Sequence, residues 1–365
     1  MASKPTTQEH FDPNSTALSD SGIFGLPYSA SDARLHLLGI PWEVTTSYGK
    51  GAARGPEAIL RASHQVDLFD IETGEAWRPG IYLQPLSEAW ALRGRELKEL
   101  AQERLEALLA GDENSSRAQE ILRTINVASR ELNTWVESEA KRLFAEGRLV
   151  GLIGGDHSTP FGLIRALNES HRGEMGVLHI DAHADLREAY QGYEHSHASI
   201  MFNVTEQIRP KTLVQVGIRD FGRAEYDYSE SHRASGRIHT HYDRTIKRAL
   251  EDGTTWSKLV DRMIEPLPKN VYLSFDIDGL DPALCPHTGT PVPGGLSYDQ
   301  AATLIARVVE SGRRIVGFDL NEVAEVEDGE AEWDANVGAR LLFKMCGWAM
   351  ISQGLVEMPP NRGRA

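Results

Sequence analysis

Short apolar segments of strand length recur along this chain, and several of them end directly in carboxylate or histidine side chains. The segments cover residues 35–40, 149–153, 176–180, 213–218, 271–275 and 315–318. Most are separated by enough residues for a helix, and nearly continuous apolar strands are typical of a parallel sheet covered on both faces. The pattern therefore predicts an α/β fold with an open, mostly parallel sheet and helices on both faces, a three-layer α/β/α arrangement.

Two long helices are expected between the first two of these strands. Leucines at helical spacing start at Leu97, and a second helix should begin near Ser116, with Gln119 placed for a capping box. The sequence Gly-Asp-Glu-Asn-Ser-Ser at 111–116 is typical of a turn between them. We therefore predict a helical insertion at about 86–146.

The composition excludes several classes of partner. A net charge of −15 at pH 7 gives a surface that repels phosphate backbones on average, which argues against nucleic acid. No stretch approaches the roughly 20 apolar residues that span a bilayer, and two cysteines cannot form a disulfide framework. We expect a soluble, cytoplasmic protein with one domain over residues 31–365. Residues 1–30 should form an N-terminal extension that is flexible or wraps a neighbouring subunit.

Three of the predicted strands end in clusters of metal-binding side chains. Residues 154–158 read Gly-Gly-Asp-His-Ser, residues 181–185 read Asp-Ala-His-Ala-Asp, and residues 276–282 read Asp-Ile-Asp-Gly-Leu-Asp-Pro. Ligands bind at the carboxyl ends of strands in open α/β sheets, and paired carboxylates are unfavourable to bury unless a cation neutralises them. The six candidate ligands are His157, Asp181, His183, Asp185, Asp276 and Asp278. Such nitrogen and oxygen ligands suit two divalent ions that activate a water molecule, which predicts a hydrolase.

In their order and spacing the three motifs resemble the ureohydrolase family, which contains arginase and agmatinase, and residues 45–49 and 54–56 resemble its N-terminal loop. The resemblance implies two metal ions per subunit, held as follows: one by His157 and Asp185, one by His183 and Asp278, with Asp181 and Asp276 bridging them. It further implies that Asp185 orients a metal-bridging hydroxide and that Glu322 holds the guanidinium group of the substrate. His197, in preference to His195, aligns with the histidine that passes a proton to the leaving amine.

The choice of substrate rests on departures from the arginase pattern. Arginases recognise the amino-acid part of their substrate with an asparagine and with a second short stretch. Arg187 stands at the position of that asparagine, and residues 193–197 stand at the position of that stretch. Residues 333–342 and 41–46, together with the insertion, resemble a subset of ureohydrolases that act on free guanidine with nickel. That resemblance implies that guanidine is converted to urea and ammonia in a pocket narrowed by Thr46 and Trp333. The sequence leaves open whether the following residues also line the pocket: Trp42, Cys285 and His287.

Several alternatives remain open. Manganese could replace nickel, because the same ligands accept either ion. The substrate could instead be an alkylated guanidine, a biguanide such as metformin, guanidinobutyrate or agmatine. A silent, non-catalytic subunit should lack ligands, and the related deacetylases normally use a single zinc, so neither class fits six complete ligands well. The resemblance also implies a homo-oligomer, a trimer or hexamer, and an accessory protein that delivers nickel is a further candidate partner.

Overall fold

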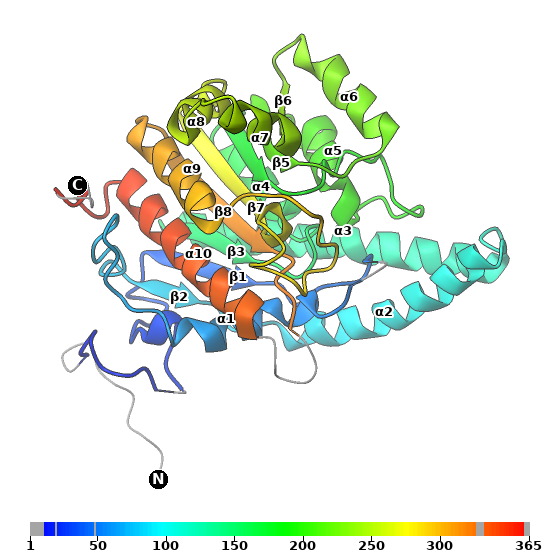
Figure 1. Cartoon of the computed structure of the whole chain (residues 1–365). Coiled ribbons are helices and arrows are strands. Elements are labelled where there is room, and N and C mark those ends of the chain that lie inside the picture. The colour runs from blue at the N-terminus through cyan, green and yellow to red at the C-terminus, as the bar shows by residue number, and fades with distance from the viewer. Residues whose placement is uncertain (1–10, 19, 47–48, 326–331, 361–365) are drawn as a thin grey trace.

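A single eight-stranded sheet organises the computed structural model, which describes residues 11–18, 20–46, 49–325 and 332–360. Its strands are β1 (Leu35–Gly39), β2 (Ile81–Leu83), β3 (Leu149–Ile153), β4 (Met175–Ile180), β5 (Thr212–Ile218), β6 (Ile238–Tyr242), β7 (Asn270–Asp276) and β8 (Arg314–Asn321). Their order is β2-β1-β3-β8-β7-β4-β5-β6, and every neighbouring pair is parallel. Helices cover both faces of the sheet (Figure 1), so the predicted three-layer α/β fold is confirmed.

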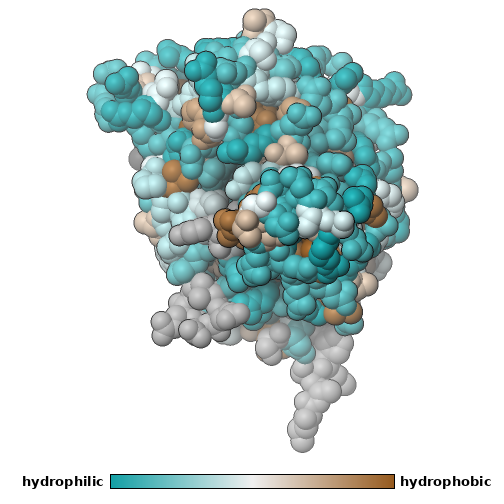
Figure 2. Space-filling view, turned by 90° about the vertical axis from the view of Figure 1, so that its right-hand side faces the viewer, coloured by the Kyte–Doolittle hydropathy of each residue, from teal (hydrophilic) through white to brown (hydrophobic). Residues whose placement is uncertain are grey.

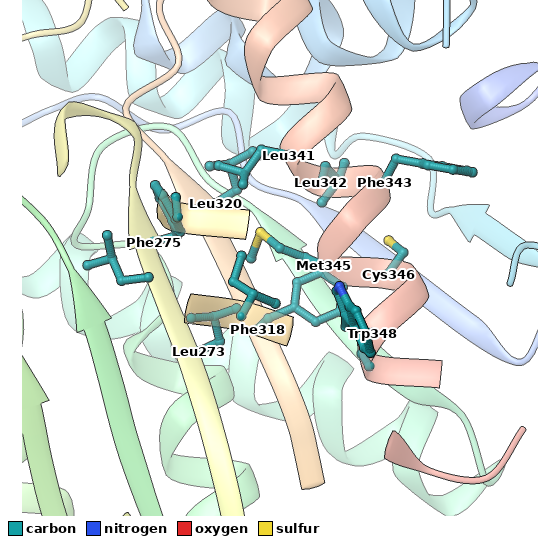
Figure 3. Packing of buried hydrophobic residues seen from close by; sticks show 14 of the residues in the cluster. Leu273, Phe275, Phe318, Leu320, Leu341, Leu342, Phe343, Met345, Cys346 and Trp348 are labelled. Carbon is teal, nitrogen blue, oxygen red and sulfur yellow. The ribbon is translucent and has the colours of Figure 1, made fainter. Parts of the chain in front are cut away.

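The helices alternate with the strands along most of the chain. They are α1 (Gly55–Ser63), α2 (Glu88–Leu109), α3 (Ser116–Ala145), α4 (Phe161–Ser170), α5 (Ile200–Asn203), α6 (Arg223–Arg233), α7 (Asp243–Glu251), α8 (Trp256–Ile264), α9 (Tyr298–Glu310) and α10 (Glu332–Ser352). One apolar cluster joins the sheet to α1, α8, α9 and α10, and a second joins it to α2, α3, α4 and α5. In the first cluster, Phe275 of β7 and Phe318 of β8 lie beside Met345 and Trp348 of α10 (Figure 3).

All six strands predicted from the sequence are present, whereas the two edge strands, β2 and β6, were not predicted. An edge strand has a neighbour on one side only and needs less apolar sequence. β2 has three residues, and β6 reads Ile-His-Thr-His-Tyr with only its first residue fully buried. Neither segment therefore carries the apolar run that identifies the central strands.

The predicted helical insertion is formed by α2 and α3, with the turn between them where the sequence placed it. α3 begins at Ser116, as predicted, but Ser116 and Gln119 do not form the predicted capping box. The side chain of Ser115 caps α3 by accepting from the backbone N–H of Ala118, while Gln119 donates to the carbonyl of Glu113. The face of the molecule on the side of the α2–α3 turn is mainly hydrophilic, with scattered apolar residues (Figure 2). The insertion thus packs on the domain through one apolar side.

Part of the predicted N-terminal extension packs on the domain. Ile23, Phe24 and Leu26 are buried in the cluster that contains α1 and α10, and Phe24 lies edge-on against Phe343. The boundary expected at residue 30 therefore falls within packed structure. The sequence did not show this packing, because the apolar side chains of residues 23–26 form a segment too short to have the period of a strand or a helix. In the described ranges no helix is both long and apolar enough to cross a membrane.

Candidate metal centre

Four neighbouring strands at the centre of the sheet, β3, β8, β7 and β4, bring the candidate site together. Each carries at least one site residue near its carboxyl end, and the first of these are His157 after β3, Glu322 after β8, Asp276 at the end of β7 and Asp181 after β4. Because these strands are parallel, their carboxyl ends meet at one edge of the sheet. The strand order, which the sequence did not predict, places these four strands next to one another and so sets which of the residues are neighbours within the site.

One group of side chains surrounds His157. Its Nδ1 atom lies 3.1 Å from Asp181 Oδ2, 3.2 Å from Asp276 Oδ2 and 3.4 Å from Asp185 Oδ2. The other ring nitrogen, Nε2, lies 2.9 Å from Ser274 Oγ, whose hydroxyl donates to Asp319. Ser274 Oγ therefore accepts from Nε2–H, so Nδ1, which faces the three carboxylates, is the nitrogen that would bind a metal ion.

A second group shares Asp181 with the first. His183 Nδ1 lies 3.0 Å from Asp278 Oδ2 and 3.5 Å from Asp181 Oδ1. Asp181 thus turns one oxygen to His157 and the other to His183, as a carboxylate that bridges two ions would. The structure brings all six predicted ligands together, and ligand atoms of Asp181, His183 and Asp278 lie within 4.8 Å of one another.

The electrostatics of the cluster fit bound cations. Burial and the neighbouring charge of Asp181 raise the pKa of Asp185 well above its usual range, and burial with Asp278 and Asp181 does the same for Asp276. When these carboxylates are ionised, their negative charges repel one another, and burial prevents water from screening that repulsion. Divalent cations would remove that repulsion, so the residues present fit a pair of metal ions bound by nitrogen and oxygen.

His179 is a site residue for which the sequence predicted no role. Gln215 Nε2 donates to His179 Nδ1 at 3.0 Å and to the carbonyl of Ala184 at 2.7 Å. The proton of His179 therefore resides on Nε2, which donates to Asp181 Oδ2 at 2.8 Å. His179 orients Asp181 in this arrangement and has no free lone pair for an ion. The signal was present in the sequence, because His179 and Asp181 are two residues apart and a strand places such residues on one side.

Glu322 presents a buried carboxylate oxygen beside the cluster. Its Oε1 accepts from the backbone N–H of His157 at 3.0 Å, and its Oε2 is buried without a hydrogen-bond partner among the described residues. Burial and the charge of Asp276 raise the pKa of Glu322 well above its usual range. Glu322 and Asp185 also adopt left-handed backbone conformations, with φ of 62° and 54°, which are uncommon outside glycine and concentrate at functional sites.

His197 lies near the cluster and contacts the loop that follows β1. Its backbone N–H donates to Thr45 Oγ1 at 3.4 Å, and its Nδ1 lies 3.5 Å from the same oxygen. Burial, with a smaller effect of His183, lowers the pKa of His197 to about 3, so its ring is neutral at pH 7. His195, in contrast, packs on the ring of Phe161 at a centroid distance of 5.1 Å.

The two remaining predicted pocket residues, Thr46 and Trp333, have different surroundings. Thr46 donates to Glu43 Oε1 at 3.2 Å, whereas the ring of Trp333 is 50% exposed and its Nε1 donates to the carbonyl of Ala283. Three other positions considered from the sequence are used in packing: Trp42 lies edge-on to Trp90, Cys285 is buried with its thiol near the Ile277 carbonyl, and His287 pairs with Asp334. Ser47 and Tyr48 of the N-terminal loop lie outside the described residues.

Comparison with known proteins agrees with this fold. Residues 33–347 match the arginase family, and the chain therefore belongs to that family. It is a ureohydrolase, a hydrolase that acts on C–N bonds of linear amidines. Among its relatives, an N(1)-aminopropylagmatine ureohydrolase of Thermus thermophilus is 32% identical over 335 residues, 91% of this chain and 96% of the relative.

Two further comparisons extend this result. An agmatinase of Edwardsiella ictaluri is 31% identical over 88% of this chain and 89% of its own length. The solved structure of proclavaminate amidino hydrolase from Streptomyces clavuligerus aligns with a TM-score of 0.69 at 22% identity, over 92% of this chain and 99% of that one. The two relatives thus have names that refer to different substrates, and the solved structure supports the fold alone.

Proposed function

We propose that the protein hydrolyses free guanidine, so that guanidine and water yield urea and ammonia. The observation that carries this proposal is the unpartnered, buried Oε2 of Glu322 beside the ligand cluster. A planar cation with several N–H donors satisfies such an oxygen better than any neutral group does. Nickel is the favoured ion on the resemblance of residues 41–46 and 333–342 to nickel-dependent guanidine hydrolases, with manganese as the alternative.

The burial of the site supports a substrate without a tail. Asp181, Asp276 and Glu322 are 0%, 4% and 6% exposed, whereas the side chain of His183 is 25% exposed, so the cluster is buried around Glu322 and more open on the side of His183. Arg187, where arginases have an asparagine, forms an ion pair with Glu225 at 3.4 Å and lies over the ring of Tyr190. That position is therefore engaged in packing, which speaks against recognition of an amino acid.

Each proposed catalytic group has one task. Two divalent ions, when bound, supply a deprotonated water as the nucleophile at neutral pH. Glu322 binds the guanidinium group through Oε2, and Asp185 accepts a hydrogen bond that orients the nucleophile towards the guanidinium carbon. His197, neutral at pH 7, accepts a proton and returns it to the departing amine, which leaves as ammonia.

We expect His197→Ala to lower kcat for urea release about 10²-fold at unchanged metal content, because positioned proton transfer contributes at least that much. His195→Ala is the matched control, since that ring packs on Phe161 away from the ligands, and it should retain most of the activity. Steady-state kinetics with metal analysis of both variants tests the assignment. If His197→Ala kept more than about a tenth of the wild-type rate, proton transfer would have to be assigned elsewhere.

The substrate proposal is tested by urea release from protein reconstituted separately with nickel and with manganese. The panel is free guanidine, methylguanidine, dimethylguanidine, metformin, guanidinobutyrate, agmatine and arginine. We expect the highest kcat/KM on free guanidine, with nickel more active than manganese. A higher kcat/KM on any tailed or alkylated member would overturn the substrate while keeping the ureohydrolase chemistry, and inactivity on all of them would favour a non-catalytic subunit.

An agmatine derivative is the second candidate, because the 32% identical relative is named for N(1)-aminopropylagmatine. Such a substrate would require space for a long amine tail beside Glu322. A cytoplasmic location, a homotrimer or homohexamer and a nickel-delivery partner remain proposals that rest on composition and on the family resemblance.

A further inference from the structure

The helical insertion reaches the candidate site through one lysine of α2. We propose that Lys98 is a positioning residue for substrate selection: it fixes the described parts of the loop after β1, residues 42–46 and 49–53, and thereby keeps the pocket closed to guanidines with a tail. The inference rests on the proposed function for the identity of the preferred substrate. The contact itself does not depend on that identity.

Lys98 is bound to the loop by three contacts. Its Nζ donates to the carbonyl oxygen of Thr46 at 2.9 Å and to Thr46 Oγ1 at 2.5 Å, and it lies 3.4 Å from Glu43 Oε1. The side chain of Lys98 is 26% exposed and that of Glu43 is 8% exposed. Charge-assisted hydrogen bonds between side chains that are largely shielded from solvent are stronger than ion pairs at the surface. Lys98 therefore holds Thr46 in one position.

Glu43 links two parts of the loop by hydrogen bonds to its carboxylate. Its Oε2 accepts from the backbone N–H groups of Gly51 at 2.8 Å and Ala53 at 3.1 Å, while Oε1 accepts from the hydroxyl of Thr46 at 3.2 Å. One carboxylate thus joins the two ends of the loop. A buried carboxylate needs a nearby cation, and Lys98 is that cation.

The loop contacts the site on several sides. The carbonyl of Trp42 accepts from the N–H of Asp156, which precedes the ligand His157, and Thr45 contacts His197. Gly49 N–H donates to the carbonyl of Gly289 at 3.1 Å. Displacement of the loop would therefore alter the surroundings of the bound guanidinium without removing a metal ligand.

A second contact supports the loop from the insertion. Trp42 lies edge-on to Trp90 of α2 at 5.9 Å between ring centroids, and Trp90 lies 6.0 Å from Trp135 of α3. Gly94 of α2 also faces this loop, because a Cβ there would lie in ordinary van der Waals contact with the carbonyl oxygen of Pro41, at 3.4 Å. The insertion therefore supports the loop through apolar packing, and Lys98 adds the polar contact that fixes Thr46.

The test compares Lys98→Met, which keeps length but removes the charge, with Lys98→Arg and with Arg95→Met, an exposed cation one turn earlier on α2. We expect Lys98→Met to raise KM for guanidine about tenfold, with a smaller change in kcat, and to shift the agmatine-to-guanidine ratio of kcat/KM about tenfold towards agmatine. Lys98→Arg should restore most of the selectivity, and Arg95→Met should match the wild type. Backbone hydrogen exchange in residues 43–46 and 49–53 should accelerate in Lys98→Met alone, with metal content unchanged.

A folded Lys98→Met protein with wild-type loop exchange and an unchanged substrate ratio would overturn the proposal. If Lys98→Met fails to fold, Glu43→Gln breaks the same ion pair from the loop side, and a wild-type substrate ratio in that variant would be equally contradictory. Failure of the proposed function is distinguishable, because it would appear as a wild type that prefers another guanidine. Loop exchange and the KM change for that substrate would then still test Lys98.

Discussion

Asp181→Asn should bind less than one divalent ion per chain and should release urea about 10³-fold more slowly than the wild type. Asp181 is the carboxylate that both ligand groups share, with Oδ2 facing His157 and Oδ1 facing His183. An asparagine that keeps its oxygen towards the N–H of His183 would direct its amide at the Nε2–H of His179, so two donors would face each other. Loss of charge and this mismatch both weaken metal binding, which elemental analysis after gel filtration measures.

Asp281→Asn is the matched control, because Asp281 belongs to the same motif as two ligands but is exposed. Its Oδ1 accepts from the N–H of Ala283 at 2.9 Å, a contact that asparagine can also make. We expect this variant to keep both its metal content and its rate. An Asp181→Asn protein that retained two ions and wild-type turnover would contradict the placement of Asp181 between them.

Glu322→Gln should lower kcat/KM for guanidine about 10²–10³-fold while leaving metal content unchanged. The glutamine can keep the contact with the N–H of His157 through its oxygen, but its amide replaces the unpartnered Oε2 by a donor. A donor facing the N–H groups of guanidinium is repulsive, and the charge that binds the cation is lost. Urea release and elemental analysis on the same preparation separate this effect from loss of metal.

Glu325→Gln provides the comparison for Glu322→Gln. Glu325 lies three residues further on and pairs with Arg54 and Arg61 near the surface, so its replacement should change the rate by less than about threefold. Equal losses in the two variants would indicate a general effect of charge near the site. More than a tenth of wild-type activity in Glu322→Gln would assign guanidinium binding to another residue.

The sequence was sufficient for the central strands and for the clustering of the six candidate ligands, because three of the apolar segments run directly into a polar cluster. Parallel strands place their carboxyl ends at one edge whatever their order, so the clustering of His157, Asp181 and Asp276 followed from the strand predictions alone. The edge strand β6 was missed because its alternating histidine and threonine residues lack an apolar run.

Long-range contacts were beyond the sequence for physical reasons. The tautomer of His179 and the contacts of Lys98 depend on which strand and which helix lie alongside them, since Gln215 is 36 residues from His179 and Thr46 is 52 residues from Lys98. The position of Trp333 was likewise not predictable from local sequence, because its Nε1–H donates a hydrogen bond to the carbonyl of Ala283, 50 residues away, near the surface. Local patterns contain no information about such pairings, which are set by the topology of the whole sheet.

The most direct test of a two-ion centre at this sheet edge is a titration of the metal-free protein with nickel, with bound metal and urea release from guanidine measured at each step. We predict saturation at two ions per chain, with most of the activity appearing as the second ion binds. Saturation at a single ion per chain with full activity would contradict the dinuclear centre on which the proposed mechanism rests.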